Sequence, residues 1–143
     1  MEIDNGPILG APSTQPIVTT GTISNITTTT AECINNNLDG IGGDGVTSWG
    51  VCWSTSFYPT ITDPLTQESG PFVVGAIPDS TMTGLTSDET YHVRTYAINS
   101  SGPGYGSDVE FTTSKTPAIT RALNIGGKTM TFGGKRIIKS PKS

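Results

Sequence analysis

One stretch near the carboxyl end has the residue types of a phosphate-binding loop. The run Ala-Leu-Asn-Ile-Gly-Gly-Lys-Thr, residues 122–129, matches the loose pattern of such loops, with alanine in place of the first glycine. That chemistry requires a strand before the loop and a helix after it, so that backbone N–H groups and the helix N-terminus surround the phosphate. The residues that follow, MTFGGK, are broken by glycine and β-like, and only fourteen residues follow Thr129. The sequence therefore argues against a nucleotide site.

Two other features could do chemistry, but each lacks the partners that it needs. His92 is the only histidine, and the sequence places neither a second metal ligand near it nor a nucleophile opposite it. Two-residue alternation puts it on the outward side of its strand, so we expect an exposed histidine. Asp39 and Asp44 lie in a glycine-rich stretch, where a turn is favoured because their spacing lacks the alternating oxygen ligands of a calcium loop. We expect no enzymatic activity, cofactor or metal.

Charge is divided unequally along the chain. Residues 1–114 contain twelve acidic residues and one basic residue, a net charge of −11, whereas residues 115–143 contain seven basic residues and no acid, a net charge of +7. Such asymmetry usually marks an interaction arm. Opposite charges would also allow the tail to fold back on the acidic body, and this alternative stays open. Because the body would repel a phosphate backbone, nucleic acid is not an expected partner.

The basic arm has the residue types for adding a strand to a protein surface. β-like runs at 118–125, 129–132 and 136–139 are separated by Gly-Gly-Lys turns, and strands this short need a partner sheet. We expect isoleucines to enter apolar pockets, cations to meet acidic residues and glycines to permit close backbone approach. The predicted partner-binding residues of the arm are Lys128, Phe132, Lys135, Arg136, Ile137, Ile138, Lys139 and Lys142.

The body has the pattern of an antiparallel β-sandwich. No stretch repeats apolar residues at helical spacing, and about seven short runs rich in β-branched residues alternate with turns. Strands are expected at 17–23, 27–35, 46–54, 71–77, 80–85, 90–99 and 107–113. Between them we expect a loop over 35–45 and an irregular connection over 55–70. Trp49, Val51 and Trp53 share one face and form the expected centre of the core.

The amino-terminal residues and the cysteines bear on where the protein acts. Residues 1–15 indicate an extended lead-in with no apolar run of signal-peptide length, and no segment reaches the ~20 apolar residues of a membrane span. We therefore expect a chain that is made in the cytoplasm and stays soluble. Cys33 and Cys52 are too few for a disulfide scaffold, and two reduced, partly buried thiols are favoured over one disulfide bond.

The end of the body carries a family resemblance. The run LTSDETYHVRTYAINSSGPGYGSDVEFTT, residues 85–113, resembles the end of a fibronectin type III domain, with Leu85 preceding Tyr91 at the spacing of that family's tyrosine corner. The runs T-T-A-x-C and G-V-C-W-S-T-S, the latter followed by a proline, are similar to repeats in exported proteins of Bacteroidetes-type bacteria. The resemblance departs from that pattern where NNLDGIGGDG replaces a shorter Asp-Gly-Gly turn.

This resemblance covers about residues 16–114 and does not extend to the tail. It implies an all-β fold, a fibronectin type III/immunoglobulin-like antiparallel sandwich. The expected organisation is an extended N-terminal arm over 1–15, the sandwich over 16–114 and a basic Gly/Lys-rich arm over 115–143.

Single domains with tethering arms resemble the decoration, fibre-base and collar proteins of tailed-phage particles. This resemblance implies a structural accessory protein of a virion, assembled in the host cytoplasm and docked by its arms on a major capsid, portal or tail-associated protein. The alternative is a secreted or cell-surface bacterial adhesion module for glycans or proteins, which predicts an oxidised Cys33–Cys52 pair. In both readings Phe57, Tyr58 and Tyr105 are possible surface-binding residues, for host glycans or for protein, and the alternative that they pack the ends of the sandwich stays open. No membrane partner is expected.

Overall fold

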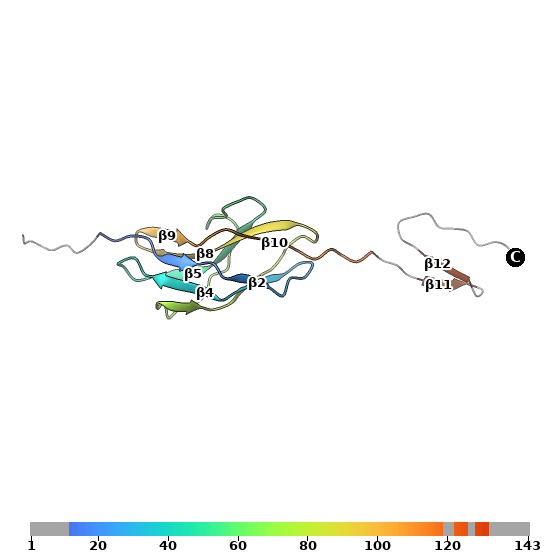
Figure 1. Cartoon of the computed structure of the whole chain (residues 1–143), viewed down its shortest axis with the longest axis horizontal. Helices are drawn as coiled ribbons and strands as arrows, with labels where there is room; N and C mark the ends of the chain where they lie inside the picture. Colours follow the sequence, from blue (N-terminus) through green and yellow to red (C-terminus); the bar gives the residue numbers. More distant parts are fainter. Residues whose placement is uncertain (1–11, 119–121, 126–127, 132–143) are drawn as a thin grey trace, which may run out of the picture.

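The computed structural model describes residues 12–118, 122–125 and 128–131 (Figure 1). All regular secondary structure in these ranges is β-strand. These residues contain no helix that is long and apolar enough to cross a membrane. The strands are β1 (Ile17–Thr19), β2 (Thr22–Ser24), β3 (Ala31–Ile34), β4 (Asn36–Gly40), β5 (Ser48–Ser54), β6 (Gly75–Ile77), β7 (Ser80–Met82), β8 (Thr90–Asn99), β9 (Gly102–Tyr105), β10 (Val109–Thr112), β11 (Ala122–Ile125) and β12 (Lys128–Thr131).

Strands β1 to β10 form a fibronectin type III-like antiparallel sandwich. One side of the sandwich contains two three-stranded sheets, with the orders β1-β4-β6 and β2-β3-β7. Each strand of the first is adjacent in sequence to the corresponding strand of the second, so that β1 continues into β2, β3 into β4 and β6 into β7. The facing sheet has the order β10-β8-β5, with β9 also paired to β8. Leu65 and Glu68 form bridges to β5, so the connection after β5 adds a further edge segment to that sheet. This gives three strand positions against four, the architecture that the sequence resemblance implied.

The core lies between the two sheets and divides into two apolar clusters. The first contains Ala31, Cys33, Val51, Trp53, Met82, Leu85, Tyr91, Val93 and Phe111. The second contains Val18, Leu38, Val46, Trp49, Ile77 and Ala97. The burial of Trp49, Val51 and Trp53 is confirmed, and these three side chains link both clusters because they alternate along one strand.

The tyrosine corner is present where the sequence placed it. The Tyr91 hydroxyl accepts a hydrogen bond of 3.0 Å from the backbone N–H of Thr86, which fixes the crossing from β7 to β8. Leu85 is buried in the first cluster beside it. The strand predicted over 90–99 is confirmed as β8, the central strand of its sheet.

The loop predicted over 35–45 is wrong in its first half, because residues 36–40 form β4. Turn propensity favoured a loop, but Asn36 and Leu38 alternate inward and both are buried. Asn36 occupies a buried position where an apolar residue would be usual, and its side chain makes four hydrogen bonds there. Its Oδ1 accepts from Gly21 N at 2.9 Å, Thr95 Oγ1 at 2.7 Å and Cys33 Sγ at 3.0 Å, and its Nδ2 donates to the Cys33 carbonyl at 3.0 Å.

The strand predicted over 17–23 is divided into β1 and β2, and the strands predicted over 27–35, 46–54, 71–77, 80–85 and 107–113 are shorter than predicted. The strand expected over 71–77 is formed only over Gly75–Ile77. The strand expected over 27–35 begins at Ala31, because the Thr27 hydroxyl accepts hydrogen bonds from the N–H groups of Thr29 and Thr30 and closes a turn there.

The tail contains an antiparallel hairpin. Strands β11 and β12 pair from Ala122 opposite Thr131 to Ile125 opposite Lys128. A strand therefore follows the Gly-Gly pair where a phosphate loop would need a helix, which agrees with the argument against a nucleotide site. Lys128 begins β12. The other predicted arm residues lie outside the described residues: Phe132, Lys135, Arg136, Ile137, Ile138, Lys139 and Lys142.

Candidate functional site

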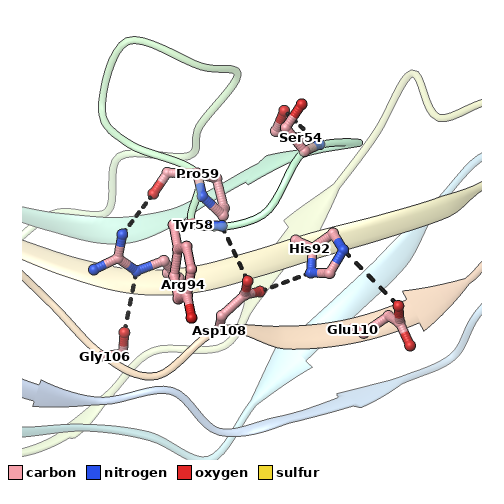
Figure 2. A network of polar contacts seen from close by, with 9 residues as sticks. Ser54, Tyr58, Pro59, His92, Arg94, Gly106, Asp108 and Glu110 are labelled. Carbon is pink, nitrogen blue, oxygen red and sulfur yellow. Dashed lines mark hydrogen bonds and ion pairs between the residues drawn. The ribbon is translucent and has the colours of Figure 1, made fainter.

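The connection after β5 carries an exposed aromatic pair, Phe57 and Tyr58, and we call residues 55–59 the aromatic loop. Figure 2 shows Tyr58 and Pro59 of this loop above their supports. The side chains of Phe57 and Tyr58 are 69% and 66% exposed. Their ring centroids are 6.3 Å apart and the rings are inclined at 45°, so the pair forms a shallow wedge. Aromatic side chains exposed to this degree are a common feature of surfaces that bind sugars or proteins.

The carboxylate of Asp108 holds this loop on the outer face of the β10-β8-β5 sheet (Figure 2). Its Oδ2 accepts a hydrogen bond of 3.0 Å from the backbone N–H of Tyr58, and its Oδ1 lies 3.0 Å from His92 Nδ1. His92 Nε2 faces the Glu110 carboxylate at 3.8 Å. Because β8 and β10 pair in register, His92 on β8 lies directly opposite Glu110 on β10. Asp108 directly precedes β10, so both acidic partners of His92 come from the same segment of the chain.

The expectation that His92 is exposed was wrong. Its side chain is 7% exposed, and the Phe57 ring lies over the imidazole with the two centroids 4.2 Å apart. Alternation correctly placed the residue away from the core between the sheets. That outer face is covered here by the aromatic loop, and alternation within β8 carries no information about the path of a distant loop.

The guanidinium of Arg94 is a second support under the loop (Figure 2). Its Nη1 donates to the Pro59 carbonyl and its Nε donates to the Gly106 carbonyl, each at 3.2 Å. Its central carbon lies 4.1 Å from the Tyr105 ring centroid and 5.8 Å from that of Tyr58, within the range of cation–π attraction. Arg94 thus ties the aromatic loop to the β9–β10 connection.

Tyr105 belongs to the support of the site more than to its exposed surface. It is half-buried in β9, and its hydroxyl accepts a hydrogen bond of 3.0 Å from the backbone N–H of Ile61. The structure therefore brings Phe57, Tyr58 and Tyr105 to one region, but only the first two present most of their ring surface to solvent.

The backbone of Tyr58 has the left-handed conformation, with φ of 60°. A residue other than glycine adopts it at a cost of about 1 kcal/mol or more, so surrounding contacts must hold it there. The hydrogen bond to Asp108 and the carbonyl contact of the next residue, Pro59, supply that restraint. The backbone that carries the Tyr58 ring is therefore restrained by contacts with the sheet beneath it.

The partners of the His92 ring bear on what chemistry this region could perform. The described contacts of the His92 ring are with two carboxylates and the Phe57 ring, so no hydroxyl or thiol is hydrogen-bonded to it in this part of the chain. General-base activation of a nucleophile requires that contact. No group of three possible metal ligands occurs among the described residues.

The two carboxylates that resembled a calcium loop take part in hydrogen bonds with the chain. Asp44 accepts hydrogen bonds from the hydroxyls of Ser13 and Ser100, which hold its pKa below the ordinary value. Asp39 accepts from the Thr19 hydroxyl at 2.7 Å. These contacts join the N-terminal lead-in, the turn after β8 and the end of β4, as expected for a Gly/Asp-rich turn.

The two cysteines are free and fully buried, which confirms the preference for reduced thiols. Cys33 lies in the core between the sheets. Cys52 on β5 lies opposite Arg94 on β8, and both face the outer side of that sheet. The thiols therefore face different sides of a sheet, and the disulfide predicted for an exported protein is not formed. Burial raises the pKa of Cys33 to about 11 and that of Cys52 to about 12.

No family model matches the sequence, and no curated protein matches it. Among solved structures, the fibronectin type III domain of human collagen XX is 19% identical over 73% of this chain and 100% of that chain, with a TM-score of 0.49. The sensor domain of the anti-sigma factor RsgI4 from Pseudobacteroides cellulosolvens is 15% identical over 72% of this chain and 98% of that one, with a TM-score of 0.48. The fibronectin type III domain derived from human KIAA0970 protein is 15% identical over 88% of this chain and 85% of that one, with a TM-score of 0.47. At these identities the similarity concerns the fold alone.

Proposed function

We propose that this chain is a non-enzymatic interaction module whose aromatic loop is the binding surface of the sandwich. The observation that carries the proposal is that Phe57 and Tyr58 are largely exposed while the backbone beneath them is fixed by Asp108 and Arg94. Phe57 covers His92 and Tyr58 lies near Arg94, but most of the surface of both residues stays exposed, which favours a role in recognition.

We further propose that the module is a structural accessory protein of a virus particle, of the capsid decoration, fibre-base or collar type. In this proposal the basic arm docks on another virion protein and the sandwich projects outward for adhesion or spacing. The division of charge supports it, because residues 115–143 are basic throughout while residues 1–114 are strongly acidic. Strand addition combined with charge pairing is a known way for such an arm to bind.

A bacterial surface or secreted adhesion module is the second candidate. The aromatic loop favours it equally, because exposed rings can stack on sugars as well as on protein. The placement of Cys33 and Cys52 on different sides of a sheet counts against the oxidised pair that this candidate predicts. The virion proposal needs no disulfide.

Two changes separate the role of the arm from that of the loop. Particles are prepared with the full chain, with a chain ending at residue 118, and with the double variant Phe57→Ala/Tyr58→Ala. The shortened chain keeps every described contact of the sandwich, the last of which joins Thr116 to Ser87. Immunoblotting of gradient-purified particles then measures incorporation, and binding of the particles to host cells measures adhesion.

We expect the shortened chain to be lost from particles, because it lacks the docking arm. The double variant should be incorporated normally and should bind host cells less well. Normal incorporation of the shortened chain would refute the tether. Absence of the full chain from every particle fraction would reject the virion role and favour the surface adhesion module.

A further inference from the structure

A second exposed apolar surface lies far from the aromatic loop, at the end of the sandwich where β4 ends. Ile17, Val73 and Val74 are 62%, 59% and 59% exposed. Ile17 lies opposite Gly40, the last residue of β4, and Val74 directly precedes β6, which pairs with the same end of that strand. We call Ile17, Val73, Val74 and the free edge of β6 the acceptor face.

The edge of β6 can take another strand. In the order β1-β4-β6 it is the last strand, and its outer side pairs with no other strand among the described residues. Ala76, in the middle of β6, is small and exposed, so an approaching backbone would meet little steric hindrance. An unpaired edge beside exposed valines is a surface that proteins usually protect with charge or cover with a partner.

Among the described residues, the charged side chains on or next to β1, β4 and β6 are acidic. Asp39 on β4 and Asp79 after β6 are exposed, and Asp44 follows at the same end of the sandwich as Asp39. The two basic residues of the described sandwich lie elsewhere. Arg94 is held beneath the aromatic loop, and Lys115 lies 3.5 Å from Asp88 near the end where the tail leaves. A cationic, apolar segment is therefore the chemical complement of this face.

We propose that the acceptor face binds residues 135–139, Lys-Arg-Ile-Ile-Lys, of a second copy of this chain. The segment has two adjacent isoleucines between three cations. Added to the edge of β6, it would place an isoleucine on the valines and its cations near Asp39 and Asp79. The proposal goes beyond the proposed function, because it concerns contacts between copies and holds for the purified chain.

The geometry favours a second copy over the tail of the same chain. The tail leaves at the level of the first residues of β8, where Ser114 N donates to the Thr27 carbonyl, and the acceptor face lies near the other end, where Asn99 contacts the Ile41 carbonyl (Figure 1). A strand of ten residues such as β8 is about 33 Å long, and the sheets are about 10 Å apart.

The tail has little length for that path. The hairpin of β11 and β12 brings the chain back to where it began, so the residues that can span the gap are 115–121 and 132–134. Fully extended, these reach at most about 36 Å, and they would have to pass around the domain. A neighbouring copy has no such limit. Because donor and acceptor are different surfaces, the contact is heterologous and can continue from copy to copy.

The test uses the purified full chain in sedimentation velocity over a concentration series. Two variants each disable one side: Val74→Lys places a cation on the acceptor face, and Ile138→Asp places an acid in the donor segment. Val74→Thr is the matched control, since it keeps the β-branched shape without the charge. Thermal unfolding of each variant confirms that the sandwich is intact, as expected for substitution of an exposed valine.

We expect the wild-type chain to form dimers and longer species as concentration rises, and each disabled variant to stay monomeric. A mixture of the two disabled variants should form one-to-one dimers and stop there, because one acceptor and one donor remain. Added salt should weaken association by at least about tenfold between 50 and 500 mM. A wild-type chain that stays monomeric to about 1 mM, or a mixture that fails to associate, would overturn the proposal. A compact wild-type monomer that expands in the Val74→Lys variant would show the chain's own tail on the face instead.

Discussion

Replacement of Asp108 tests whether one carboxylate fixes the aromatic loop. Asp108→Ala removes the acceptor for the backbone N–H of Tyr58 and the partner of His92 Nδ1, both at 3.0 Å. Hydrogen bonds to charged groups contribute about 1.5–3 kcal/mol each, and the loop can reach water when released, so we expect a total loss of about 2–3 kcal/mol. For a domain of this size that corresponds to a fall in melting temperature of about 10–15 °C.

Asp108→Asn is the matched control. Its carbonyl oxygen can still accept from Tyr58 N, and its amide can donate to His92 Nδ1 in the other tautomer, so we expect a loss below about 1 kcal/mol. Urea unfolding followed by tryptophan fluorescence measures stability. Hydrogen exchange at the Tyr58 amide measures the loop directly, and it should accelerate in the alanine variant and remain slow in the asparagine variant.

Two results would contradict this reasoning. An alanine variant as stable as the wild type would mean that the two hydrogen bonds contribute nothing to stability. Unchanged exchange at the Tyr58 amide in the alanine variant would mean that other contacts, such as that of Arg94 with the Pro59 carbonyl, hold the loop alone. In that second case partner binding should also survive the substitution.

Four further predictions concern the sandwich. Burial raises the pKa of Cys33 to about 11 and that of Cys52 to about 12 from the ordinary 9.0, so between these pH values the folded state keeps thiol protons that the unfolded state loses. The free energy of unfolding contributed by these thiols should therefore be full below pH 9 and fall as the pH rises to 12, which urea unfolding at several pH values would measure. Both thiols should react with a thiol reagent only after unfolding, and rapid reaction of native protein would contradict their burial. Tyr91→Phe should cost about 1–2 kcal/mol in urea unfolding because Thr86 N loses its acceptor, whereas no loss would remove the tyrosine corner as a stabilising feature. Asn36→Leu should cost at least about 3 kcal/mol or prevent folding, measured by calorimetry, because buried donors lose their acceptor; a stabilised variant would refute this.

The sandwich could be predicted from the sequence because large apolar residues recur at every second position of its central strands. Trp49, Val51 and Trp53 of β5 all lie in the core clusters, and the Leu85–Tyr91 spacing fixes one crossing between the sheets. β4 was missed because its residues individually favour turns. Asn36 is tolerated in the core only because Thr95, 59 residues away, and Gly21 supply hydrogen bonds, and no local pattern indicates contacts at that distance.

The candidate site was predicted only in its exposed half. Phe57 and Tyr58 stand out in sequence as aromatics in a polar loop beside proline. Their supports do not, because His92, Arg94 and Asp108 would each be ordinary on a solvated strand face. A usable signal does exist in retrospect: the adjacent outward positions of β8, 92 and 94, carry ionisable groups in a body that otherwise has few cations.

The distribution of positive charge distinguishes the aromatic loop from the acceptor face. Alternation separates residues that face the core from those that do not, but both proposed binding surfaces lie on the outer side, whose surroundings alternation does not predict. On that side the Arg94 guanidinium is surrounded by carbonyls and rings, and the aromatic loop supplies one of each, the Pro59 carbonyl and the Tyr58 ring. The acceptor face shows the converse, since Val73 and Val74 remain bare among carboxylates and no cation of the described sandwich lies near them. The single cation of residues 1–114, Arg94, lies beneath the aromatic loop, which covers it. The acceptor face has no such cation, and its negative charge is therefore free to attract the cationic segment that we propose to bind there.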